Sequence, residues 1–284
     1  MADKQNKGKV LGFDSPSLST HYLRMIPYGS DITMSTGTGF VYESNSKLYL
    51  ITNGHNITRV NPETNTRISS SSAFPVIIKT KLKLIPTDNP DALVVSDFFE
   101  ISLYEDSEYL KPNWLIHPDH GYKVDVIAIP FVDVAELPSH VKLFPINSFY
   151  FTEFPLIVAD DVFILGYPFD LTGGMELPIW KRGTIATEPS LDLNNLPKML
   201  IDTATRSGMS GAPVLMRRRG IHGLSAKVTG EEIIGLVQQF AGIYSGRIGA
   251  AHQFQVQLGI VWKGHVIEEI INGNRMGDIG FQKI

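Results

Sequence analysis

The chain contains 284 residues, of which 43% are hydrophobic and 10% aromatic, a composition that excludes a largely disordered protein and fits one or two domains. Its formal net charge of −4 argues against nucleic acid or an anionic membrane as the main partner, because both bind basic surfaces. The absence of cysteine excludes disulfides, thiol nucleophiles, iron–sulfur clusters and thiolate zinc sites. Hydroxyl, imidazole and carboxylate groups remain as reactive side chains.

Residues 1–10 are polar and charged, and they lack the apolar core of a secretory signal. The longest apolar runs, such as residues 162–165 and 258–262, are far shorter than a membrane-spanning helix, which needs about 20 residues. We therefore expect a cytoplasmic protein with no membrane partner.

Short β-rich segments follow one another along the chain, separated by single glycine and proline residues. They include residues 39–42, 48–52, 76–80, 124–129, 161–165 and 232–237. Repeated short strands between turn residues are typical of an all-β sandwich or barrel, whereas a parallel α/β sheet alternates strands with long amphipathic helices. A helical pattern occurs only near the C-terminus, where apolar residues recur with helical spacing over 266–271 and Gly273 provides a stop. The sequence predicts an all-β protein with a short C-terminal helix.

Three segments carry residue types that fit nucleophilic catalysis. His55 lies in a turn after an apolar strand, Asp125 begins an apolar strand, and Ser210 lies between small residues just before a strand. A serine hydroxyl needs a neighbouring base, and that base needs a third group to orient it. Gly208 and Gly211 allow a sharp turn that exposes the Ser210 oxygen and lets N–H groups converge on an oxyanion.

Asp125 is the candidate orienting group because a partly buried carboxylate needs a hydrogen-bond partner, and the His55 imidazole can provide one. Asp119 and Asp91 are alternatives, although neither begins so clear an apolar strand.

In chain order, these segments resemble the His, Asp and Ser blocks of the chymotrypsin-like (trypsin-fold) serine peptidases. Residues 208–214 are similar to the family's Gly-x-Ser-Gly-Gly-Pro-hydrophobic block, with Ala212 replacing the second glycine. Residues 50–55 resemble its Thr-Ala-x-His block, with Asn53-Gly54 at the small positions, and residues 125–128 resemble its Asp block. Without cysteine, the chain looks most like the bacterial HtrA-like branch, but without the PDZ domain usual there.

The resemblance implies two six-stranded antiparallel β-barrels with the site between them. We expect an N-terminal extension at 1–30, a first barrel carrying His55 and Asp125 at 31–140, a second barrel carrying Ser210 at 141–264, and a helix and tail at 265–284.

By the same resemblance, the function is that of a serine endopeptidase acting on a protein or peptide substrate through a His55–Asp125–Ser210 triad and an acyl-enzyme. The N–H groups of Gly208 and Ser210 form the oxyanion hole, and no cofactor or metal takes part. Two alternatives stay open: a catalytically silent trypsin-fold module that binds peptides, and a dedicated regulatory protease with one partner substrate. The sequence leaves the oligomeric state open.

The resemblance also implies a substrate pocket. Its base is Ala204, followed by Thr205, and its wall comes from Val237, Gln238, Gln239 and Phe240. Because Ala204 is not acidic, we expect a small or medium uncharged residue on the acyl side of the scissile bond. Met209 cannot accept the ion pair of a newly cut N-terminus, so we expect no activation by N-terminal cleavage.

Two histidines flank a proline and an aspartate in the segment 117–120, and such side chains can ligate a metal. Adjacent ligands on a turn do not match the i, i+4 helical arrangement of zinc motifs, so we expect an ordinary loop.

Overall fold

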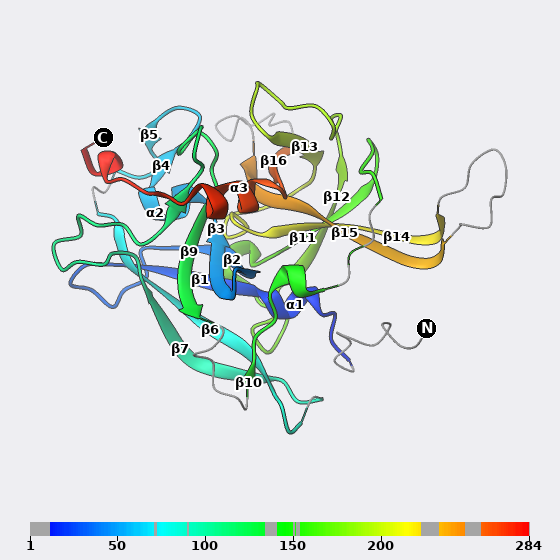
Figure 1. Ribbon diagram of the computed structural model, residues 1–284, viewed down its shortest axis with the longest axis horizontal. Coiled ribbons are helices and arrows are strands. Elements are labelled where there is room, and N and C mark those ends of the chain that lie inside the picture. The colour runs from blue at the N-terminus through cyan, green and yellow to red at the C-terminus, as the bar shows by residue number, and fades with distance from the viewer. Residues whose placement is uncertain are drawn as a thin grey trace.

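The computed structural model describes residues 12–70, 73–89, 91–133, 141–149, 151, 154–222, 233–247 and 257–283. The chain forms two antiparallel β halves that lie side by side, the first drawn from blue to green and the second from green to orange (Figure 1). No helix among these residues is long and apolar enough to cross a membrane.

The first half is a nine-stranded sheet with the order β10-β6-β1-β2-β3-β9-β8-β17, and β7 pairs with β6. Its strands are β1 Thr20–Pro27, β2 Ser35–Ser44, β3 Lys47–Thr52, β6 Pro75–Pro86, β7 Val94–Ser102, β8 Leu115–Ile116, β9 Ile127–Asp133, β10 Val141–Lys142 and β17 Arg275–Met276. A small hairpin of β4 Val60–Asn61 and β5 Thr66–Arg67 lies apart from this sheet. Along β9, Ile127 and Ile129 enter one apolar cluster while Ala128 enters another, as the two-residue period of a strand requires.

The second half is a closed barrel with the order β11-β12-β13-β16-β15-β14. Its strands are β11 Asp161–Gly166, β12 Ile179–Ile185, β13 Lys198–Asp202, β14 Pro213–His222, β15 Ile233–Arg247 and β16 Leu258–Lys263. Alternate apolar side chains of three strands fill the barrel, namely Val162, Ile164, Met199, Ile201, Val214 and Met216. Closure pairs each strand of this barrel with two neighbours, so no sheet edge is left open among its described strands.

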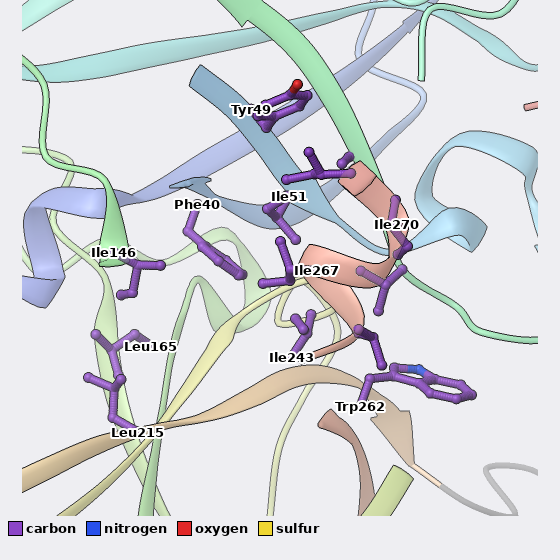
Figure 2. Close-up of a cluster of buried hydrophobic side chains, with 14 of the residues drawn as sticks. Phe40, Tyr49, Ile51, Ile146, Leu165, Leu215, Ile243, Trp262, Ile267 and Ile270 are labelled. Atoms are coloured by element: carbon purple, nitrogen blue, oxygen red, sulfur yellow. The ribbon is translucent and has the colours of Figure 1, made fainter. Parts of the chain in front are cut away.

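The C-terminal helix joins the two halves. Helix α3 spans Val266–Gly273, as the sequence predicted, and buries Val266, Ile267, Ile270 and Ile271. These side chains belong to a cluster that takes residues from both halves. Figure 2 shows Ile267 between Phe40 and Ile51 of the first half and Ile243 of the second. The helix therefore contributes to the packing that holds the two halves together.

The remaining helices are short. They are α1 Pro16–Ser19, α2 Gly54–Thr58 and 3₁₀ turns at Ile146–Ser148, Pro168–Asp170 and Gly280–Lys283.

The all-β, trypsin-like architecture is confirmed, but the first half differs from the predicted six-stranded barrel. Its hydrogen-bonded ladder has nine strands and is not closed among the described residues. The predicted extension 1–30 is corrected, because β1 pairs with β2 and β6, while residues 1–11 lie outside the described part. The predicted divisions at 141 and 265 also shift, since β10 and β17 both pair with strands of the first half.

Candidate active site

His55 is held against Asp125 at the end of β3. It lies in α2, which follows directly after that strand, and its Nδ1 is 2.6 Å from Asp125 Oδ2. The backbone N–H of His55 donates to the other carboxylate oxygen, Oδ1, at 2.8 Å. A Cβ added at Gly54 would lie 3.3 Å from Oδ1, so the glycine keeps this approach open.

Asp125 receives a third donor from the second half of the molecule. Ser245 Oγ of β15 donates to Asp125 Oδ2 at 2.5 Å, and Asn53 Nδ2 donates to the Asp125 backbone oxygen at 2.6 Å. The Asp125 side chain is 2% exposed. The two donors of His55 and the hydroxyl of Ser245 therefore replace the water that a buried carboxylate loses. A carboxylate only accepts, which places the His55 proton on Nδ1 and leaves Nε2 as an acceptor.

Ser210 is fixed by the first half although it belongs to the second. Its carbonyl oxygen accepts hydrogen bonds from the Thr38 N–H at 2.9 Å and from Asn56 Nδ2 at 3.2 Å. The following residue, Gly211, has φ 88°, and a Cβ there would clash with the Thr38 backbone oxygen. The residue after Ser210 must therefore be glycine, because the turn touches β2 and has positive φ.

Two backbone N–H groups, those of Gly208 and Ser210, are available to bind an anion. The Ser207 carbonyl accepts a hydrogen bond from the Phe169 N–H at 2.9 Å. Because the C=O and N–H of a trans peptide point in opposite directions, the Gly208 N–H points away from Phe169. No described residue accepts a hydrogen bond from the N–H of Gly208 or Ser210. Such unpaired donors are what a developing oxyanion requires.

A cleft of about 570 Å³ brings these groups together. His55 and Ser210 both line it, and its other walls include Ser207 and Gly208 on one side and Tyr244–Gly246 of β15 on the other. The structure therefore brings together all three predicted triad residues and both predicted oxyanion donors.

The predicted pocket wall lies elsewhere. Gln239 and Phe240 line a different hollow with Gly264 and His265, and Val237 is buried opposite Arg218 of β14. Gln238 likewise pairs with β14, and none of the four lines the cleft. The residues of β15 that line the cleft are Tyr244–Gly246, near the C-terminal end of this 15-residue strand. The sequence reasoning placed the wall just after Gly235, whereas the useful signal was the serine that reaches Asp125, Ser245.

The predicted pocket base differs in a similar way. Ala204 and Thr205 do not line the cleft; Thr205 is fully buried, and its hydroxyl is hydrogen-bonded to the Tyr244 hydroxyl. The residues of this segment that do reach the cleft are Arg206 and Ser207.

The segment 117–120 has a structural role. His117 Nδ1 accepts the backbone N–H groups of Asp119 and His120, both at 3.2 Å, and its Nε2 is 3.1 Å from Glu269 Oε2 on α3. Nε2 therefore carries the proton and donates to the carboxylate. The side chain ties this turn to the C-terminal helix.

The family of trypsin-like peptidase domains matches residues 37–223, which is more than half of the chain. The chain belongs to this family. Peptidases of this kind act on proteins or peptides, and the matched segment contains His55, Asp125 and Ser210. No curated protein matches the sequence.

Solved structures similar to this trypsin-like peptidase include a serine endoprotease from Yersinia pestis, with 12% identity and a TM-score of 0.47 over 91% of this chain. The chain spans 65% of the length of that protein. An inactive mutant of Rv3671c from M. tuberculosis H37Rv is 14% identical, with a TM-score of 0.45 over 94% of this chain and 90% of its own.

Proposed function

We propose that this trypsin-like peptidase is a serine endopeptidase in which Ser210 is the nucleophile, His55 the general base and Asp125 the group that orients the base. One observation carries the proposal: the buried Asp125 carboxylate receives donors from His55 and from Ser245, which belong to different halves. The proposal is supported further because His55 lines the same cleft as Ser210.

In the proposed reaction, His55 Nε2 takes the hydroxyl proton as Ser210 Oγ attacks the substrate carbonyl carbon. The negative charge that develops on the carbonyl oxygen is stabilised by the N–H groups of Gly208 and Ser210, each worth about 3 kcal/mol in comparable peptidases. Asp125 stabilises the imidazolium that forms. His55 then protonates the leaving amine, the C–N bond breaks, and water hydrolyses the acyl-enzyme by the same steps.

Apolar packing and hydrogen bonds hold the turn at residues 208–210, which carries the two proposed oxyanion donors. Met209 is fully buried in the apolar cluster of the second barrel, and Thr38 Oγ1 donates to the Gly208 carbonyl oxygen at 2.7 Å. Apolar packing and backbone bonds thus hold the turn where an acidic residue would need a cationic partner. We propose that the chain needs no N-terminal cleavage to become active.

Covalent labelling by a fluorophosphonate probe tests the function. We expect the uncut protein to be labelled, Ser210→Ala to lose labelling, and Ser207→Ala, an exposed serine of the same cleft, to keep it. An unlabelled wild-type protein would contradict the proposal and favour a silent peptide-binding module. Labelling that appears only after N-terminal trimming would contradict the proposed activation.

A further inference from the structure

The cleft beside Ser210 continues between two walls. One wall is the segment 206–208, which leads into the nucleophile, and the other is formed by Tyr244–Gly246 and Ile260. If the substrate carbonyl lies against the N–H groups of Gly208 and Ser210, the side chain of the same substrate residue enters between these walls. The protein side chains around that space therefore decide which substrate side chains fit.

Tyr244 occupies it. The residue lines the cleft, yet it is only 2% exposed, so nearly all of its side chain is buried within the second half. Its hydroxyl is hydrogen-bonded to that of Thr205. Thr205 is fully buried and directly precedes the segment 206–208 that forms the other wall. The tyrosine therefore spans the distance from β15 to the chain that precedes Ser210.

Gly259 of β16 makes room for the ring. A Cβ added at Gly259 would lie 2.5 Å from Tyr244 Cε2, closer than any real contact, so only glycine fits under the ring. The ring is thus held by Gly259, by the hydroxyl pair with Thr205 and by the barrel cluster to which Tyr244 belongs. A side chain fixed on three sides cannot swing away to admit a large substrate group.

We propose that Tyr244 is the specificity-determining residue of this peptidase and closes the pocket for the acyl-side residue, which restricts cleavage to sites after glycine, alanine or serine. The inference rests on the proposed peptidase function and narrows it to one class of substrate. It also fits the finding that Ala204 and Thr205 do not line the cleft, because the Thr205 hydroxyl is hydrogen-bonded to that of Tyr244, which does.

Cleavage of a peptide library by the wild type and by Tyr244→Val tests the proposal. We expect wild-type cleavage after small residues, and we expect Tyr244→Val to raise kcat/KM for leucine or phenylalanine, relative to alanine, by at least about tenfold. Tyr244→Phe keeps the ring and should keep the wild-type profile. Phe240→Leu is the matched control, because it changes an aromatic side chain of the same strand outside the cleft.

Fluorophosphonate labelling of each variant reports a folded site independently of the substrate side chain. A labelled wild type that cleaves after phenylalanine, leucine or lysine overturns the inference alone, as does a labelled Tyr244→Val with an unchanged profile. An unlabelled wild type overturns the proposed function and this inference with it. If Tyr244→Val does not fold, Tyr244→Leu takes its place. The cleavage profile of the wild type tests the inference in either case.

Discussion

Asp125 and Lys83 are both buried charged groups, with 2% and 0% of the residue exposed, but the protein surrounds them differently. Asp125 receives three donors within 2.8 Å. Lys83 Nζ has only longer contacts, at 3.4 Å to His21 Nδ1 and at 3.3 Å to both Tyr167 Oη and the Glu176 carbonyl oxygen. Among the described residues, no carboxylate pairs directly with Lys83, because that of Glu176 is bound to Lys81 at 2.9 Å.

The difference has electrostatic consequences. Burial lowers the pKa of Lys83 from 10.5 to about 7, and the nearby charge of Glu176 offsets only part of this shift. Burial, followed by the charge of Lys83, also lowers the pKa of His21. At the Asp125 carboxylate, in contrast, two N–H groups of His55 and the hydroxyl of Ser245 replace the lost water. Short hydrogen bonds thus converge on the buried Asp125 carboxylate, whereas Lys83 has only longer contacts among the described residues, and burial there disfavours the charged form.

The largest expected effect comes from changing the Asp125 carboxylate. Asp125→Asn introduces an amide N–H, which favours the wrong tautomer of His55 while the packing stays nearly the same. We expect kcat for a cleaved peptide to fall about 10⁴-fold, as in related triads. Asp119→Asn, an exposed residue of the neighbouring hollow, should change kcat little. A loss below tenfold in Asp125→Asn would show that Asp125 does not orient the base.

The lowered pKa of Lys83 is tested by the pH dependence of stability. The unfolded chain keeps the ordinary lysine pKa of 10.5, whereas the folded chain has about 7, so the unfolded state binds more protons between these values. The free energy of unfolding should therefore rise with pH across this window, by at most about 1.4 kcal/mol per pH unit from this group. Urea denaturation at several pH values measures the slope.

Lys83→Met should remove this contribution, and the difference between the two slopes isolates it from other titrating groups. Lys47→Met is the control, because Lys47 is an exposed lysine on β3 of the same sheet. Equal slopes in wild type and Lys83→Met would mean that Lys83 does not titrate in this range.

The smallest effect comes from removing one of the three donors to Asp125. Ser245→Ala should reduce kcat by about tenfold, because a hydrogen bond to a charged group contributes about 1.5 kcal/mol. Ser245→Thr keeps the hydroxyl and should recover most of the rate. Steady-state kinetics with one peptide measures both rates. An unchanged kcat in Ser245→Ala would show that the two hydrogen bonds from His55 orient Asp125 without the serine.

The first-half boundaries show where sequence reasoning reaches its limit. The strand Thr20–Pro27 was predicted as part of an extension, yet it pairs with both β2 and β6. One partner, β2, is the next strand along the chain, but the other, β6, begins at Pro75, and no local pattern predicts that pairing. The strands β10 and β17 are two residues long, too short for any periodicity, and they form only because the rest of the sheet provides an edge.

The sequence by itself determined the all-β class, the C-terminal helix, and the positions of His55, Asp125 and Ser210, because turn glycines, apolar alternation and the identity of reactive side chains are local properties. Only the tertiary structure decided that Ser245 donates to Asp125, that Tyr244 rather than Val237–Phe240 lines the cleft, and that no carboxylate of the described residues pairs with the buried Lys83. These features depend on the register of long strands and on contacts between the two halves. Such contacts join residues far apart in the chain, and packing rather than local preference selects them.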